Sequence, residues 1–192
     1  MANSSRINGF IPVGTINSNN TMTEMICAFA AADSVAAFVG DLVLFTGVYD
    51  AAGIPIVKQA AATDVGLAGA VVSFDVDGAK LETIYRLAST ARYCRVNVDP
   101  NTIYECQGNA ALALIDAGCR FKPVVAAGST TLGTSGMQLD VSTKATTATF
   151  PLQVVRFSPA LDNAPAATYN KLYVKINSHA FGSLGTTGVQ GS

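Results

Sequence analysis

Short apolar segments separated by turn residues dominate the first half of the chain. Pairs such as Gly40-Asp41 and runs such as Asp50-Ala-Ala-Gly53 stand between them. Apolar runs of about four to eight residues bounded by glycine and aspartate are typical of β-strands, whereas helices need longer periodic stretches. The pattern therefore predicts strands at residues 36–39, 42–48, 54–57 and 67–74, as in a small barrel or sandwich.

A second group of strands is expected after Asp77-Gly78, a dipeptide that favours a hairpin turn. The predicted strands are residues 81–87, 93–98 and 103–106. Within residues 93–98, Tyr, Arg and Asn alternate with Cys, Val and Val, so one face of this strand should be buried and the other wet. The sequence Asp99-Pro-Asn-Thr102 suits a type I turn, because the aspartate can accept hydrogen bonds from turn amides and proline presets its dihedral angle.

A third group of strands follows the glycine-, serine- and threonine-rich connector at residues 126–136. The predicted strands are residues 137–141, 146–157 and 172–177. Pro151 has no N–H group for a sheet ladder, so its strand should lie at an edge or carry a bulge. The apolar spacing of residues 25–37 fits one short helix.

Strands outnumber helices in this pattern, and regular alternation of helix and strand is absent. The predicted fold class is therefore all-β: a β-barrel or β-sandwich of short antiparallel strands, with an extended N-terminal arm and at most one or two short helices. The β-rich domain should cover residues 23–182, with possible sub-units at 23–76, 77–126 and 127–182.

The two ends of the chain have a polar or small-residue composition. Residues 1–22 are rich in Asn, Ser and Thr and predict an extended arm, which is either a loose terminus or a strand donor to a neighbour's sheet edge. Residues 183–192 consist mainly of Gly, Thr and Ser and predict a flexible tail.

Charged residues are scarce, at 13% of the chain against about 25% in an average soluble domain, while 49% of residues are hydrophobic. A weakly charged exterior favours self-association or a permanent assembly, although an ordinary Ser/Thr-rich surface is equally compatible with this composition. The net charge of −1 gives no support for a nucleic acid or a membrane surface as partner.

Charge is also unevenly distributed. Residues 1–77 carry two basic and seven acidic groups, whereas residues 78–192 carry ten basic and six acidic groups. Parts of opposite sign can help subunits to dock in order. Six basic residues lie between Lys80 and Lys122, and with only 8% aromatic residues they predict either a solvated face or a docking face for acidic loops, in preference to a nucleic-acid site.

No reactive constellation is recognisable in the sequence. His179 is the one histidine and no G-x-S-x-G motif accompanies it, so a local packing role is expected for this side chain. The four cysteines lie far apart in strand-like apolar settings, without a C-x-x-C pair, and should be free buried thiols; they are Cys27, Cys94, Cys106 and Cys119. We therefore expect no catalytic, cofactor-binding or metal-binding residues.

Two stretches match ligand-binding loops only in part. Asp75-Val-Asp77-Gly78 resembles the start of a calcium loop, but the same alignment puts Ser73 at the first ligand position and Ile84 in place of the closing glutamate. Residues 128–136 are rich in glycine but lack the lysine and the following helix of a phosphate loop. An acidic hairpin and a flexible connector are the favoured interpretations.

Several motifs in the second half of the chain recur together in one family of virion proteins. The run Gly133-Thr-Ser-Gly-Met-Gln-Leu-Asp140 is followed by a Thr/Ala-rich turn, an apolar strand that ends at Phe157, and a closing strand Val174-Lys-Ile-Asn-Ser-His179. The segment Asp99-Pro-Asn-Thr-Ile-Tyr-Glu-Cys-Gln107 precedes them. Over roughly residues 90–180 the chain thus resembles the head decoration, or cement, proteins of tailed bacteriophages.

The resemblance implies a non-enzymatic virion structural protein, made in the host cytoplasm, that binds the outside of the mature capsid. Its partner would be the major capsid protein, whose subunits it would bridge against the pressure of packed DNA. Cyclic homo-oligomers, trimers especially, match the local symmetry axes of a capsid. The alternatives are a tail- or fibre-associated virion protein, a carbohydrate-binding module, and a hydrolase that uses His179.

Candidate capsid contacts follow from the residues themselves, because apolar and basic side chains in the polar arm or on a wet strand face are available to a partner. The expected contacts are Arg6, Ile7, Phe10, Ile11, Arg92 and Arg95.

Overall fold

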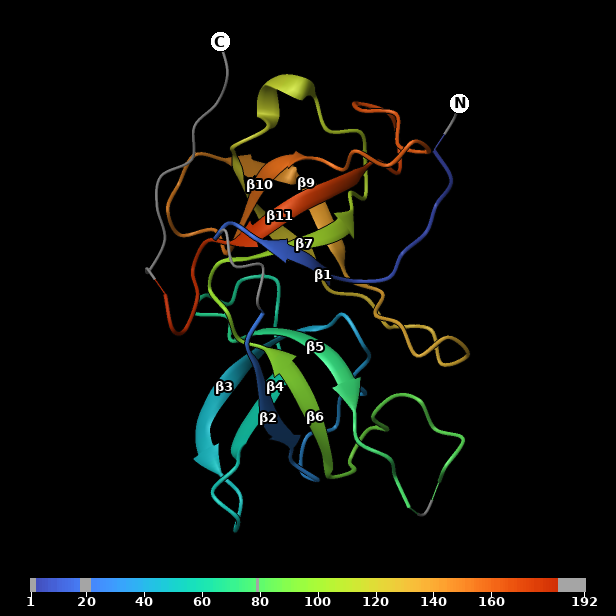
Figure 1. Ribbon diagram of the computed structural model, residues 1–192, viewed down its shortest axis with the longest axis vertical. Coiled ribbons are helices and arrows are strands. Elements are labelled where there is room, and N and C mark those ends of the chain that lie inside the picture. Colours follow the sequence, from blue (N-terminus) through green and yellow to red (C-terminus); the bar gives the residue numbers. More distant parts are fainter. Residues whose placement is uncertain (1–2, 18–21, 79, 183–192) are drawn as a thin grey trace.

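The computed structural model describes residues 3–17, 22–78 and 80–182, and within these ranges it contains β-strands and one 3₁₀ turn (Figure 1). The all-β class expected from the sequence is confirmed. In chain order the elements are β1 (Ile11–Thr15), β2 (Glu24–Phe29), β3 (Leu42–Tyr49), β4 (Pro55–Gln59), β5 (Gly69–Phe74), β6 (Arg92–Asn97), β7 (Thr102–Gln107), η1 (Leu114–Asp116), β8 (Arg120–Val124), β9 (Gln138–Ala145), β10 (Leu152–Phe157) and β11 (Lys171–Ile176).

Strands β2 to β6 form a closed barrel in the order β2-β4-β3-β5-β6. Its pairs are antiparallel apart from β2 and β4, which run parallel and pair only at Ala28–Ile56 and Phe29–Val57. Because side chains alternate along a strand, every second residue points into the barrel. The buried inward residues are Cys27, Phe29, Ala37, Val43, Val57, Ala68, Val71, Cys94, Val96 and Val98.

The other strands form a six-stranded antiparallel sheet in the order β1-β7-β11-β10-β8-β9, which lies above the barrel in Figure 1. The sheet curls, because Gly108 directly after β7 forms a bridge with Leu139 of β9. The curled sheet encloses a second core that includes Tyr104, Cys106, Phe121, Leu139, Leu152, Val154, Leu172, Val174 and Ile176.

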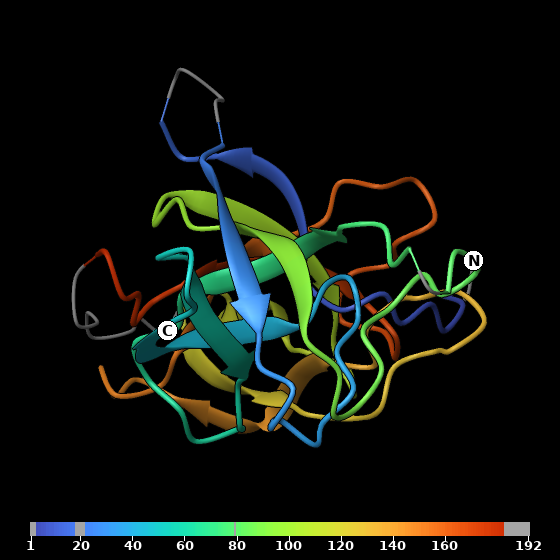
Figure 2. The ribbon, with the colours of Figure 1, turned by 90° about the horizontal axis from the view of Figure 1, so that it is seen from below.

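The two sheets share this second core at their junction. Phe10, from the segment before β1, and Leu42 and Ala70, from the barrel, are fully buried in the same cluster as the residues of the six-stranded sheet. Leu67 also forms a parallel bridge with His179, which follows β11. The barrel and the curled sheet are stacked along the long axis of the molecule in Figure 1, and in Figure 2, seen from below, the barrel lies in front of the sheet.

The chain crosses from the barrel to the sheet at the turn predicted from Asp99 onward. The Thr102 N–H donates to the Asp99 carbonyl (3.1 Å) and the Asn101 N–H to the Asp99 carboxylate (2.9 Å), which confirms this turn. Asn97 was expected on the wet face of its strand, but it is buried at the junction. Its side-chain oxygen accepts hydrogen bonds there from the hydroxyls of Thr102 (2.8 Å) and Tyr104 (3.2 Å).

The short helix expected at residues 25–37 is wrong. Residues 24–29 form β2, and a loop follows. The apolar residues Met25, Cys27 and Phe29 also fit a period of two, and Cys27 and Phe29 fill the barrel core. This short apolar run fits the period of a helix and that of a strand equally well, and burial in the barrel decides in favour of the strand.

The strand expected at residues 81–87 is also wrong, because residues 75–78 and 80–91 contain no strand and only an isolated bridge from Arg86 to Ala37. A turn is present at Asp77-Gly78, where the Lys80 N–H donates to the Asp77 carbonyl (3.0 Å), but no strand follows to complete a hairpin. Leu81 and Ile84, which suggested a buried strand face, are exposed.

Pro151 stands immediately before β10 instead of inside it, so no ladder hydrogen bond is lost. The expected edge position is wrong, since β10 lies between β11 and β8. The strand does carry an irregularity, but between Val154 and Arg156, away from the proline.

Residues 3–15 fold onto their own chain instead of extending as a free arm. Strand β1 pairs with β7, and the Asn3 side chain donates to the carbonyls of Ala164 (3.1 Å) and Thr168 (3.0 Å). Strand β1 lies at the sheet edge, where Pro12 and the register shift after it make further strand pairing unfavourable. The tail predicted at residues 183–192 lies outside the described residues.

The sheets do not follow the three sub-units expected from the sequence. Strand β6 belongs to the barrel although it follows residue 77, so the change from one sheet to the other falls at the turn of residues 99–102. All strands after this turn, together with β1, form a single sheet.

Candidate protein-binding groove on the barrel

An irregularity in the β3–β4 hairpin shapes the most apolar hollow described on the surface. Phe45 pairs with Val57 and Tyr49 with Pro55, so three residues of β3 face one residue of β4. Gly47, in the middle of the three, has a φ of 78°, a conformation that glycine adopts without strain. The hairpin therefore bends between Phe45 and Tyr49 and turns its tip away from the regular ladder.

Asp50 fixes the tip of this hairpin. Its carboxylate accepts hydrogen bonds from the N–H groups of Ala52 and Ile54 (2.8 Å each) and from the hydroxyl of Tyr93 on β6 (2.8 Å). The bond from the Ile54 N–H is the main reason that the pKa of Asp50 lies below its usual value, and the Tyr93 hydroxyl acts in the same direction. Asp50 thus carries a negative charge at neutral pH beside the hollow.

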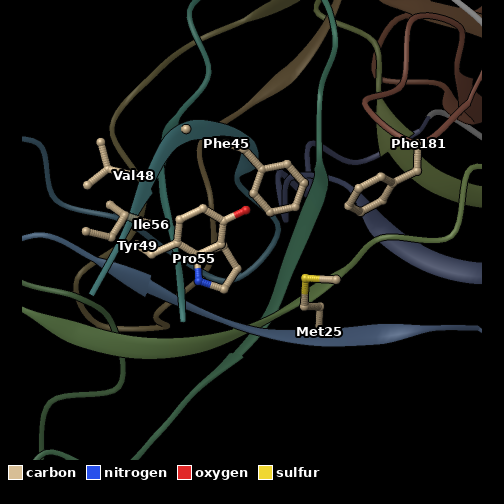
Figure 3. A pocket seen from close by; sticks show the side chains of 8 residues that line it. Met25, Phe45, Val48, Tyr49, Pro55, Ile56 and Phe181 are labelled. Carbon is tan, nitrogen blue, oxygen red and sulfur yellow. The ribbon is translucent and has the colours of Figure 1, made fainter. Parts of the chain in front are cut away.

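The hollow, which we call the barrel groove, has a volume of about 370 Å³ (Figure 3). Its lining residues are Met25, Phe45, Gly47, Val48, Tyr49, Pro55, Ile56 and Phe181. In Figure 3, Met25, Phe45 and Phe181 stand around one part of the groove, and Tyr49 and Pro55 stand at the other. The centres of the Phe45 and Phe181 rings are 5.3 Å apart. This contact joins the loop after β11 to the barrel wall.

The walls of the barrel groove remain open to solvent. Val48 is 57% exposed, Tyr49 64% and Phe181 56%. Among the lining residues the Tyr49 hydroxyl is the one polar side-chain group, and none of these residues is charged. Large exposed apolar side chains that gather at one place mark binding surfaces, because burying them releases free energy roughly in proportion to area.

A second hollow of about 240 Å³ adjoins the barrel groove, and the two share Ile56. It lies over the outer side of β2 and β6 and is lined by Ala28, Ala30 and Tyr93, among others. Asp50 and Arg92 also line this second hollow, so it has charged groups that the barrel groove lacks.

His179 positions one wall of the barrel groove. It is 2% exposed, and its Nδ1 accepts a hydrogen bond from the N–H of Phe181 (3.0 Å). Burial lowers the pKa of His179 to about 4, although the charge of Asp99 acts in the opposite direction. The imidazole is therefore neutral at pH 7 and holds the turn that presents Phe181.

The sequence-predicted contacts from the arm lie on the six-stranded sheet. Arg6 and Ile7 are exposed, and Ile11 is half-buried at the start of β1. Phe10 is fully buried in the shared core, so its expected contact with a partner is wrong: a side chain without exposed surface has none to offer.

The two predicted contacts on β6 differ from one another. The Arg92 guanidinium donates to the carbonyls of Asp75 (2.9 Å), Thr83 (2.9 Å) and Tyr85, and it lies 5.5 Å from the centre of the Phe74 ring. Arg92 therefore holds the loop that contains Thr83 and Tyr85 to the barrel, and all three of its guanidinium nitrogens donate within the chain. Arg95 is exposed on the same strand. The structure thus places the predicted contacts on two separate surfaces.

Sequence reasoning missed the residues of the barrel groove. Met25 was assigned to a helix, Val48 ended a predicted strand with Tyr49 just after it, and Phe181 lay between the last predicted strand and the tail. The interruption of an apolar strand by Thr46-Gly47 was the one signal available, because glycine inside a strand often marks a bulge.

The four cysteines are free and buried, as predicted. Burial raises the pKa of the Cys27 thiol to about 11 and raises the pKa of Cys94, Cys106 and Cys119 as well. In the part of the chain that the structure describes, no three His, Cys, Asp or Glu side chains are grouped closely enough to hold a metal ion.

Comparisons of this chain with models of protein families, with curated proteins and with solved structures find no match. No helix within the described ranges has the length and hydropathy to cross a bilayer.

Proposed function

We propose that this protein is a decoration protein of a tailed-phage head, which binds the outer surface of the mature capsid and bridges neighbouring subunits of the major capsid protein. The barrel groove is the observation that supports this proposal most directly. It offers exposed aromatic and aliphatic side chains, without charge, on a rigid closed barrel. Such a surface suits permanent contact with another protein, where apolar and aromatic residues form the centre of the interface.

The protein would act mechanically, by adding contact area between neighbouring capsid subunits. When an aromatic side chain is fully buried, about 150–250 Å² of its surface loses contact with solvent. Because Tyr49 is 64% and Phe181 56% exposed, covering each would contribute roughly 2–4 kcal/mol before the cost of association. A contact of this size, repeated over the capsid lattice, would resist separation of the subunits under internal pressure. Self-association as a cyclic trimer would place several grooves around one symmetry axis.

Co-sedimentation with purified phage heads that lack the decoration protein tests the proposal. The double variant Val48→Ser/Tyr49→Ser should bind at least about tenfold more weakly, because it removes two exposed groove side chains without touching the barrel core. The matched control is Leu161→Ser, which removes a fully exposed leucine from a loop of the six-stranded sheet.

Electron microscopy of labelled particles then separates the shell from the tail. The proposal requires the label on the head surface at saturating protein. Label confined to the tail or its fibres would contradict it in favour of a tail-associated protein, and absence of binding to heads would contradict it outright.

A further inference from the structure

One side of the β2 backbone, next to the barrel groove, pairs with no strand of the described residues over Glu24–Ile26. The Val98 N–H donates to the Thr23 carbonyl (2.9 Å), and the register continues from there through Glu24–Asn97 and Ile26–Arg95. In an antiparallel ladder, hydrogen-bonded and non-hydrogen-bonded pairs alternate. The N–H and carbonyl groups of Met25 and Cys27 therefore face β6, whereas those of Glu24 and Ile26 face the opposite side.

On that opposite side, β4 reaches only the end of β2. The two strands pair at Ala28–Ile56 and Phe29–Val57, and within the described residues no strand pairs with Glu24 or Ile26 on this side. Strand β4 begins at Pro55, which has no N–H group, and the turn held by Asp50 leads the chain away before this point. Among the described residues, a short strand edge of β2 therefore has no partner strand.

This free edge borders the barrel groove. Met25 on β2 and Pro55 and Ile56 on β4 are lining residues, so the groove lies where the two strands part. Unpaired backbone groups beside apolar hollows are the combination that strand addition uses: main-chain hydrogen bonds supply affinity, and hollows for alternate side chains supply specificity.

The charges beside the groove indicate the chemistry of its occupant. Glu24 is exposed and directly precedes Met25, and the ionised Asp50 directly follows Tyr49; the exposed Arg95 pairs with Ile26 on the β6 side of β2, away from β4. The lining residues themselves carry no charge. An apolar segment with a basic residue at its end would complement this arrangement.

We propose that the barrel groove receives an extended segment of a partner protein, which adds as a strand to β2 at Glu24–Ile26 and places alternate apolar side chains in the groove. The segment carries a basic residue beside Glu24 or Asp50. This inference rests on the proposed function, in which the partner is a capsid subunit, and it specifies which part of that subunit is bound: an exposed extended loop or arm.

Two substitutions at Ile26 separate the contribution of its backbone N–H to binding from that of its side chain. Ile26→Pro removes the N–H that faces the groove and leaves the ladder with β6 intact, because that N–H does not face β6. Ile26→Ala shortens the same side chain and keeps the N–H. We expect the proline variant to bind heads about tenfold more weakly than the alanine variant. Equal binding of the two folded variants would overturn the inference.

Amide hydrogen exchange on the unaltered protein provides a second measurement, which does not depend on the proline variant folding. In the free protein, the amides of Glu24 and Ile26 should exchange faster than those of Met25 and Cys27. Binding to heads should slow exchange at Glu24 and Ile26 by at least about tenfold. If heads bind and these two amides stay unprotected, strand addition is refuted while the proposed function stands.

A synthetic peptide, Lys-Val-Thr-Ile-Thr-Val-Lys, tests the groove without any capsid. At millimolar concentration it should slow exchange at Glu24 and Ile26, and the same peptide with methylated backbone nitrogens at alternate positions should not. This result would support strand addition even if the protein failed to bind heads. No change at either amide with the unmodified peptide, or the same change with both peptides, would overturn the inference.

Discussion

Replacing Arg86 by methionine tests whether one buried arginine holds the long loops of the barrel together. The side chain has no exposed surface. Its guanidinium donates to the carbonyls of Thr90, Ala30 and Asp33 (2.7 Å each) and to the carbonyl of Val35. The Arg86 side chain thereby joins the loop of residues 30–37 to the loop of residues 80–91, beside backbone hydrogen bonds from the Ser89 N–H to the Asp33 carbonyl (2.8 Å) and between Arg86 and Ala37.

The magnitude follows from these contacts. Arg86 also pairs with the Asp33 carboxylate at 3.6 Å and lies 5.3 Å from the centre of the Phe29 ring. Burial lowers the pKa of Arg86 and the charge of Asp33 opposes this. Because an arginine side chain stays protonated in proteins, the guanidinium is a charged donor to its carbonyl partners. Removing one partner of a buried charged network costs about 3–5 kcal/mol, a large part of a total stability of about 5–15 kcal/mol. For a chain of this size the melting temperature should fall by about 6–20 °C.

Urea unfolding followed by circular dichroism measures the effect, with Arg95→Met as the matched control. Arg95 is exposed and makes no ion pair within the described residues, so its replacement should change stability by less than about 0.5 kcal/mol. The midpoint of Arg86→Met should fall at an unchanged m-value. A loss below about 1 kcal/mol for Arg86→Met would show that the loops are held by other contacts, and the reasoning would be refuted.

Three further predictions concern buried groups. The pKa of His179 is about 4 in the folded state and about 6.5 in the unfolded state, so the unfolded state binds more protons between these two pH values. The contribution of His179 to the free energy of unfolding is therefore present above pH 6.5 and lost as the pH falls toward 4. Urea unfolding at pH 7 and pH 5 should therefore show a smaller drop in the free energy of unfolding for His179→Gln than for the unaltered protein. Equal drops would contradict this. Gly69→Ala should prevent folding or cost more than about 4 kcal/mol of stability, because the added Cβ would lie 1.7 Å from the Asn97 carbonyl oxygen. The control is Gly78→Ala, whose added Cβ meets open space. Circular dichroism compares the two variants, and similar stability would refute the steric argument. Finally, a thiol reagent at pH 8 should label the native protein far more slowly than the unfolded chain, since all four thiols are buried, and fast labelling of any cysteine in the native state would contradict the packing.

The strands that the sequence predicted correctly are those with both an apolar face and clear turn residues at their ends. Strands β3 to β7 and β11 are examples. Residues 36–39 also precede the turn pair Gly40-Asp41, but they form only isolated bridges, so the strand predicted there is wrong. Strand β2 failed because its short apolar run fits a helix and a strand equally well, and β1 failed because its polar surroundings suggested a free arm. In each case the deciding factor was a partner strand distant in the sequence.

The barrel groove was less accessible to prediction than the fold. Its residues come from β2, the β3–β4 hairpin and the loop after β11, and they meet only because the barrel closes and His179 turns the chain toward it. Of the predicted contacts, Arg6, Ile7, Ile11 and Arg95 keep surface exposure, whereas Phe10 serves the core and Arg92 holds a loop.

The sequence by itself determined the all-β class, the turn at Asp99 and the four buried thiols, because these depend on local patterns of apolar residues and on the geometry of single turns. The tertiary structure alone decided which strands pair, where β4 leaves β2, and which apolar side chains remain at the surface. Strand pairing depends on contacts between distant segments, and the same apolar residue can fill a core or line a groove according to what packs against it.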